Sequence, residues 1–161
     1  MRPDREQRMK MKSASRLYAV QALFQMEAAD EDLDEVRRQF EGHRFGAIED
    51  GTEWAEGNVD LFRAILDKAI EAQARIDQLT DRALVAKWPI DRIDPTLRAL
   101  FRAAGAELLI EAAAPKVVIS EYVDVARAFF PDGKEARFVN AVLDHIAREV
   151  NPGAFGGVPA G

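Results

Sequence analysis

The side chains whose type and spacing could do chemistry are basic, and they gather at the N-terminus. The first 16 residues contain six basic side chains against two acidic ones, whereas the other 145 residues contain 16 basic and 26 acidic side chains. If a helix covers this segment, Arg8, Lys12 and Arg16 fall at i, i+4 and i+8 on one side of it. On a chain of net charge −6, such a stripe would attract phosphates to one edge and repel them elsewhere. Charge alone leaves open a solvated, disordered arm.

Single-stranded RNA also requires flat side chains that stack on bases, and amides or hydroxyls that read base edges. Lys10 and Ser13 stand within the basic segment, and Gln21 and Phe24 follow it. Phe24 lies on the apolar face of the expected helix, so a core position is the alternative for its ring, while Gln21 is expected to be exposed. The remaining candidates are Phe130, Lys134 and Arg137. For Lys134 and Arg137 the alternative is an ordinary solvated pair.

Residue patterns that would indicate catalysis are missing. The chain has no cysteine, which excludes thiol catalysis, thiolate zinc sites and disulfides. His43 and His145 lack the Glu-x-x-His spacing of di-metal bundles. Gly133-Lys134 lacks the glycine-rich cradle of a phosphate loop, because Ala128 stands five residues before the glycine. We therefore expect a binding protein and not an enzyme, with no cofactor and no metal.

The composition also limits compartment and size. No stretch approaches the roughly 20 apolar residues of a membrane span, and the basic N-terminus lacks the apolar run of a signal peptide. The absence of cysteine favours a reducing compartment. We expect a cytoplasmic protein that does not bind membranes. Its 161 residues, 48% of them hydrophobic, suffice for one core and one domain.

The positions of apolar residues predict helices almost throughout, because they recur at intervals of three to four residues. Ser13 offers an N-cap for the first helix, and Pro95 stands at the first helical position after Asp94. Trp88-Pro89 marks a break, because a residue before proline avoids the α region. The expected helices cover about 13–28, 33–40, 54–80, a short segment before residue 88, 95–108, 115–129 and 138–146. A long loop is expected at 41–52, and the acidic segment 41–60 has no functional interpretation.

These helices predict an all-α fold with about seven helices in a single domain. Residues 1–12 form a basic N-terminal arm, and residues 13–150 form the helical domain. A soft seam near 84–89 divides this domain into sub-bundles of about 13–83 and 84–150 that pack as one unit. Residues 151–161, rich in glycine, proline and alanine, are expected to be a disordered tail.

Four strings, in their order and spacing, resemble the NusB family of bacterial transcription antitermination factors. They are Ala-Val-Gln-Ala-Leu-Phe at 19–24, Arg-Ala-Leu-Phe-Arg-Ala-Ala-Gly-Ala-Glu-Leu at 98–108, Pro-Lys-Val-Val-Ile-Ser-Glu-Tyr-Val at 115–123 and Arg-Phe-Val-Asn-Ala-Val-Leu-Asp at 137–144. The last is the most specific, and the joint match covers roughly residues 10–150. Two departures stand out: methionines interrupt the arginine run common in the family, and Phe24 stands where a tyrosine is common.

The resemblance implies partners. Family members, together with the small ribosomal protein NusE, bind the boxA element of nascent RNA within the RNA polymerase antitermination complex and promote transcription of ribosomal RNA operons. A similar helical module precedes some RNA cytosine methyltransferases, but this chain has no cysteine for that reaction. On the expected middle helix, Leu97, Arg98 and Arg102 are the predicted NusE contact.

The residues themselves leave two questions open. One alternative function is a helical protein–protein scaffold without RNA binding. The oligomeric state is either a monomer or a homodimer that masks the basic face.

Overall fold

The computed structural model describes residues 4–46, 48–49, 52–53, 56–84 and 93–155. Helices dominate the described residues, which confirms the predicted all-α class. The helices are α1 (Arg5–Ala29), α2 (Leu33–His43), α3 (Val59–Glu71), α4 (Gln73–Leu84), α5 (Pro95–Ile110), α6 (Pro115–Phe129) and α7 (Lys134–Val150), followed by the 3₁₀ helix η2 (Pro152–Phe155). Two strands of two residues each, β1 (Ile48–Glu49) and β2 (Thr52–Glu53), pair antiparallel at the end of the loop predicted over 41–52.

Helix α1 begins eight residues earlier than the sequence pattern predicts. Asp4 is its N-cap, and the Asp4 carboxylate accepts a hydrogen bond of 2.7 Å from the backbone N–H of Gln7, which satisfies one of the free donors at a helix start. Ser13, predicted as the N-cap, therefore lies in the middle of the helix. The predicted arm 1–12 is helical from Arg5 onward, and only residues 1–3 lie outside the described residues.

The helix predicted over 54–80 is interrupted at Ala72, which leaves the helical region with φ −108° and ψ 19°. Neither glycine nor proline causes this break. Helix α3 packs on α1 and α5, whereas α4 packs on α5 and α7. The change of direction at Ala72 therefore lets the two helices pack against different neighbours. The predicted break at Trp88-Pro89 and most of the predicted seam at 84–89 lie outside the described residues.

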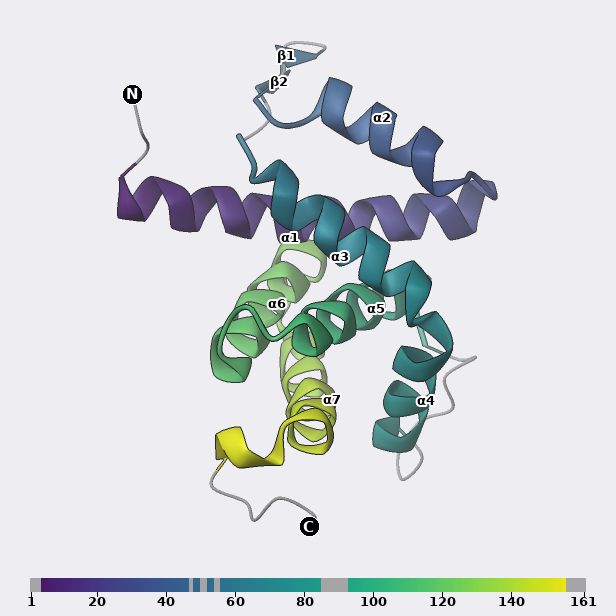
Figure 1. Ribbon diagram of the computed structural model, residues 1–161, viewed down its shortest axis with the longest axis vertical. Coiled ribbons are helices and arrows are strands. Elements are labelled where there is room, and N and C mark those ends of the chain that lie inside the picture. The colour runs from purple at the N-terminus through teal and green to yellow at the C-terminus, as the bar shows by residue number, and fades with distance from the viewer. Residues whose placement is uncertain (1–3, 47, 50–51, 54–55, 85–92, 156–161) are drawn as a thin grey trace.

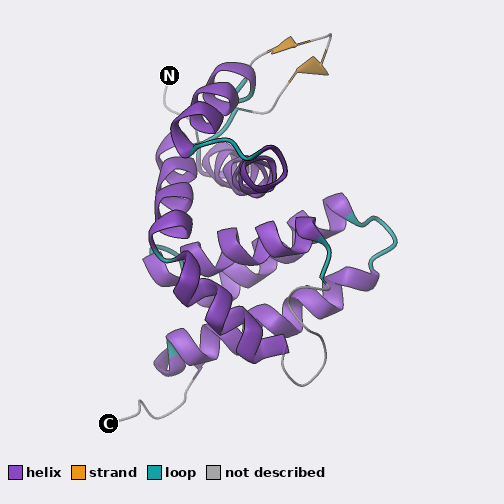
Figure 2. Cartoon of the chain, turned by 90° about the vertical axis from the view of Figure 1, so that its right-hand side faces the viewer, coloured by secondary structure: helices purple, strands orange, loops and turns teal. Residues whose placement is uncertain are grey.

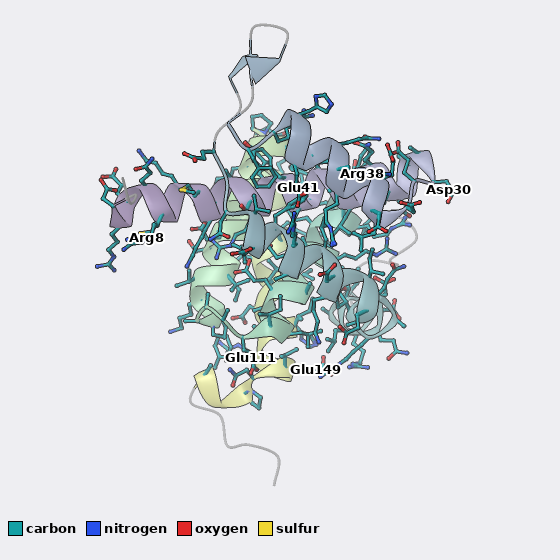
Figure 3. The ribbon with its side chains drawn as sticks, turned by 45° about the horizontal axis from the view of Figure 1, so that its top comes forward. Arg8, Asp30, Arg38, Glu41, Glu111 and Glu149 are labelled. Carbon is teal, nitrogen blue, oxygen red and sulfur yellow. The ribbon has the colours of Figure 1, made fainter. Side chains whose placement is uncertain are left out.

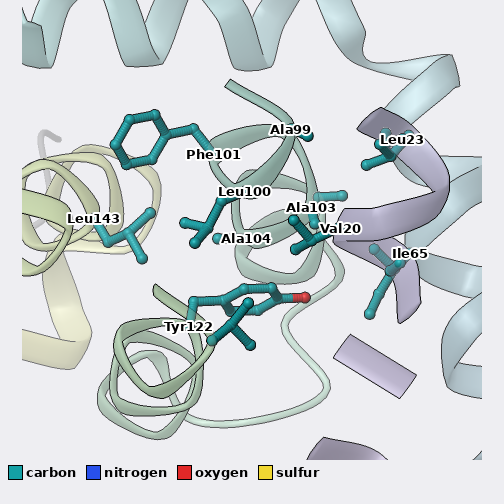
Figure 4. Packing of buried hydrophobic residues seen from close by; sticks show 14 of the residues in the cluster. Val20, Leu23, Ile65, Ala99, Leu100, Phe101, Ala103, Ala104, Tyr122 and Leu143 are labelled. Carbon is teal, nitrogen blue, oxygen red and sulfur yellow. The ribbon is translucent and has the colours of Figure 1, made fainter. Parts of the chain in front are cut away.

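Helix α5 occupies the centre of the bundle, with α1 and α3 on one side and α6 and α7 on the other (Figures 1 and 2). Its small and large apolar residues fit between those neighbours. Figure 4 shows Leu100 and Ala104 of α5 between Val20 of α1 and Leu143 of α7, and all four side chains are buried. Asp94 caps α5 and Pro95 is its first residue, as predicted.

The C-terminal end differs from the expected tail. Residues Pro152–Phe155 form η2 and pack on α7, where the Arg148 guanidinium lies 4.6 Å from the centre of the Phe155 ring. Disorder is therefore the wrong prediction for these four residues, and residues 156–161 lie outside the described part of the chain. No described helix is long and apolar enough to span a membrane.

Candidate nucleic-acid interface

The first turns of α1 carry exposed basic side chains and extend past the edge of the bundle (Figures 1 and 3). Arg5, Arg8, Lys10 and Lys12 are all exposed. The backbone N–H of Asn58 donates a hydrogen bond of 3.2 Å to the Met11 carbonyl at this end of the helix. The segment therefore presents its cations to solvent on a regular helical surface.

This placement of charge works against helix stability. Backbone N–H groups at a helix N-terminus carry partial positive charge, so acidic residues stabilise that end and basic residues weaken it. Within the first two turns of α1, only Asp4 and Glu6 supply negative charge, and Glu6 forms an exposed ion pair of 3.5 Å with Lys10. A cationic helix start is thus better suited to binding an anion than to stabilising the fold.

Arg16, predicted as the end of the RNA-binding stripe, is buried and 3% exposed. Its guanidinium donates two hydrogen bonds of 2.8 Å to the two carboxylate oxygens of Glu107 on α5, and lies 3.3 Å from Glu121 on α6. Burial by itself lowers the pKa of Arg16, but the hydrogen bonds and charge of Glu107 outweigh it and raise the pKa above its ordinary value. The prediction that Arg16 contacts RNA is therefore wrong.

The ion pair belongs to a network that fixes α1 on the bundle. The Tyr122 hydroxyl donates to Glu107 at 3.1 Å, and complete burial, followed by the nearby Glu107 charge, raises the pKa of Tyr122 well above its ordinary value. The Ser13 hydroxyl donates to Glu121 at 2.8 Å. Ser13 is thus half-buried and committed to α6, which leaves it poorly placed to read a base. The network anchors α1 directly behind its cationic end.

The other predicted RNA-binding residues lie in two regions, one on α1 and one around the turn between α6 and α7. On α1, Phe24 is 39% exposed, which favours the surface alternative over the core. Gln21 is half-buried, and its side-chain oxygen is buried without a hydrogen-bond partner among the described residues. At the end of α6, Phe130 is half-buried against the core, while Lys134 and Arg137 in the first turn of α7 are exposed.

The predicted NusE contact on α5 is largely an internal contact. Leu97 is 7% exposed and belongs to the core, so its prediction as a partner residue is wrong; α5 is enclosed by other helices and has little free face. The Arg98 guanidinium donates to Glu27 at 2.7 Å, and Arg102 donates to Asp77 at 3.0 Å and 3.1 Å. Both arginines tie neighbouring helices to α5.

Sequence reasoning missed the acidic half of the anchoring network. Glu107 and Glu121 drew no attention because 28 acidic residues are spread along the chain. One signal was available: Glu107 is a charge inside the apolar run of α5, and such a residue is seldom buried unless it is paired. The described residues contain no group of three or more His, Cys, Asp or Glu that could hold a metal ion.

A helical bundle centred on α5, with a buried ion pair behind an exposed cationic helix end, defines a small all-α protein with a concentrated positive surface. The model of the NusB family matches residues 13–148, and the chain belongs to that family. It is 42% identical over 151 residues to the transcription antitermination protein NusB of Maricaulis maris, covering 93% of this chain and 94% of the relative. The NusB of Granulibacter bethesdensis is 45% identical over 156 residues, covering 93% and 95%.

Solved structures share the fold. T. maritima NusB matches with a TM-score of 0.69 and 29% identity, over 89% of this chain and 96% of that one. The crystal structure of antitermination factors NusB and NusE in complex with double-stranded RNA matches with a TM-score of 0.70 and 22% identity, over 88% and 98%. At 22% identity, the similarity to the NusB–NusE–RNA structure shows a shared fold and nothing further.

Proposed function

We propose that this chain is a transcription antitermination factor that binds single-stranded boxA RNA together with NusE, in the cytoplasm and without catalysing a reaction. The exposed cationic start of α1 is the observation that carries the proposal. Membership of the NusB family and relatives named as antitermination proteins support it. In this proposal, Arg5, Arg8, Lys10 and Lys12 hold phosphates, and Gln21, Phe24 and the α6–α7 turn contact bases.

The proposal predicts a strong dependence of affinity on salt. Arg16 is removed from the set of phosphate contacts by its burial, but Arg5 joins the set because α1 begins at Arg5. If about four cations neutralise phosphates, the slope of log affinity against log salt is roughly −3, from about −0.7 per contact on a single strand. Replacing both Arg5 and Lys12 with alanine should flatten that slope by about 1.4.

The test is a titration of fluorescent boxA RNA at several salt concentrations, with and without NusE. The matched control is Arg75→Ala/Arg82→Ala: both residues are exposed on α4, have the same seven-residue spacing and remove the same charge. We expect the α1 pair to lose affinity and slope, and the α4 pair to retain both.

The same titration distinguishes RNA binding from the alternative function, a scaffold that binds only other proteins. A protein that binds only other proteins would bind NusE while RNA affinity stayed equal for the parent and both double variants at every salt concentration. That outcome would overturn the RNA-binding proposal. Circular dichroism of each variant checks that exposed substitutions leave the fold intact, because such charges contribute little to stability.

A further inference from the structure

The outer faces of α6 and α7 enclose a groove that the function above does not use. The two helices are neighbours joined by a short turn, and η2 packs back on α7 at one end (Figure 1). A cavity of about 380 Å³ lies between them, with Ile119 and Val123 among its apolar lining residues. Ligand sites for small molecules start at roughly 300 Å³, so the cavity has room for a unit of nucleotide size.

The rim of the groove is cationic although the protein is acidic. It carries Lys116 and Arg127 from α6 and Arg148 from α7, against a single carboxylate, that of Asp144. Arg148 donates to Asp144 at 2.8 Å, and Arg127 donates to a carboxylate outside the groove at 2.9 Å. Each guanidinium has five N–H donors, so both retain donors for a further anion.

Three polar side chains of the groove make no hydrogen bond or ion pair with another described residue: Lys116, Ser120 and Asn140. Together they offer an ammonium for a phosphate, and a hydroxyl and an amide that both donate and accept. Amides and hydroxyls are the groups that read the edges of unpaired bases. The groove therefore holds the polar groups that a nucleotide requires.

The groove also has a flat surface at one end. Phe155 of η2 lines the cavity, and the Arg148 guanidinium carbon lies over its ring, 4.6 Å from the ring centre. Aromatic rings and arginine planes are the surfaces on which unpaired bases stack, and stacking tolerates any base. The carboxylates of an acidic peptide would pair with the cations of the groove, but they could not stack on Phe155 and Arg148. A nucleotide has both a phosphate and a flat base, so we favour a nucleotide as the ligand.

The position of the groove connects it to the cationic end of α1. Ser120 in the groove precedes Glu121, which accepts the hydrogen bond from Ser13 of α1. The groove and the part of α1 that follows its cationic start therefore lie against α6 at adjacent residues.

We propose that the groove between α6 and α7 is a second RNA subsite, which binds one nucleotide of a single strand that also contacts α1. The inference rests on the proposed RNA-binding function. In this subsite Lys116 binds the phosphate, Ser120 and Asn140 contact the base edge, and the base stacks against the Arg148–Phe155 pair. RNA long enough to reach both places binds more tightly than RNA that covers α1 alone.

The first test uses adenosine and uridine monophosphates as probes in amide NMR titrations of the full chain. We expect saturable shifts confined to α6, α7 and η2, and a loss of at least tenfold in affinity in the Lys116→Ala/Asn140→Ala variant. The matched control, Arg75→Ala/Gln78→Ala, removes an exposed cation and an exposed amide from α4 and should bind as the parent does. Absence of saturable shifts, equal loss in both variants, or shifts caused by a hexaglutamate peptide and not by nucleotides would overturn the subsite.

The second test separates the subsite from the function on which it rests. The Arg5→Ala/Lys12→Ala variant should lose RNA affinity but bind mononucleotides as the parent does. The Lys116→Ala/Asn140→Ala variant should lose the extra affinity for longer RNA and still bind short RNA. If the parent binds long RNA and the groove variant binds it equally well, the subsite is wrong while RNA binding at α1 stands.

Discussion

Arg16 donates two hydrogen bonds to Glu107 where water is excluded, while Lys12, four residues earlier on the same helix, is exposed. The two cations have the same charge and lie one helical turn apart, and only Lys12 is exposed to solvent, where it can bind phosphate. Burial of a paired charge is weak evidence for stability, because desolvation offsets much of the attraction. The pair instead specifies how α1 sits on α5, and so where the cationic end points.

We predict that removing one member of the Arg16–Glu107 pair destabilises the protein far more than removing an exposed cation does. Arg16→Leu should lower the free energy of unfolding by about 3–5 kcal/mol, because Glu107 becomes a buried, unpaired charge. Arg16→Leu/Glu107→Leu should recover part of that loss, with a coupling energy of about 1–3 kcal/mol. Lys12→Ala should change stability by less than about 0.5 kcal/mol. Urea unfolding of the parent, Arg16→Leu, Glu107→Leu, the double variant and Lys12→Ala measures these differences, and strictly additive effects of the two leucine substitutions would contradict the pairing.

Helix α5 packs against five other helices, and its composition explains how it can. Alanines at several turns and Gly105 allow close approach of neighbouring helices, while Leu100 and Phe101 fill the wider spaces. Helix α4 approaches closely at Gly105, where a Cβ atom would lie 2.6 Å from the Cγ2 atom of Ile76. Because the chain breaks between α3 and α4 at Ala72, α4 changes direction and Ile76 lies against Gly105.

For this element we predict opposite effects of the same substitution at two helical glycines. Gly105→Ala should destabilise the protein by about 1–3 kcal/mol, because the added methyl overpacks the contact with α4. Gly42→Ala in α2, where nothing lies within 4 Å of the new Cβ, should be neutral or stabilise by up to about 1 kcal/mol through helix propensity. Thermal unfolding compares the two variants, and a Gly105→Ala variant as stable as the parent would show that α4 does not pack this closely.

Across the whole molecule, charge is distributed unevenly along α1. Figure 3 shows Arg8 at one end of the helix and Asp30 at the other. Acidic residues continue from Asp30 through the start of α2, so the end away from the cations repels phosphates. The central α5 joins this half of the molecule to α6 and α7, and the described residues share one apolar core.

We therefore predict that the two expected sub-bundles unfold together. A helix that packs on both halves cannot keep its buried face covered if either half opens, so unfolding should be cooperative. Urea titrations followed by circular dichroism, and by NMR peak intensities from α3 and from α7, should give coincident midpoints. Separate midpoints for α3 and α7 would instead indicate two independent folding units.

The sequence by itself determined the helical class, the approximate positions of most helices and the basic character of the N-terminus. Those properties depend on local periodicity, capping residues such as Asp94 with Pro95, and summed charge, all of which can be read along the chain. The start of α1 was predicted at Ser13, whereas Asp4 caps the helix and Arg5 is its first residue. The Ser13 hydroxyl instead bonds to Glu121, 108 residues away in the sequence, and local spacing could not reveal that contact.

Only the tertiary structure decided which charges are surface and which are core. Arg16 pairs with Glu107 across 91 residues of sequence, and Leu97 is enclosed because α5 lies between two layers of helices. The groove between α6 and α7 combines Lys116, Asn140 and Phe155, which are far apart along the chain. Burial and long-range pairing depend on the packing of distant helices, and local residue spacing carries no information about that packing.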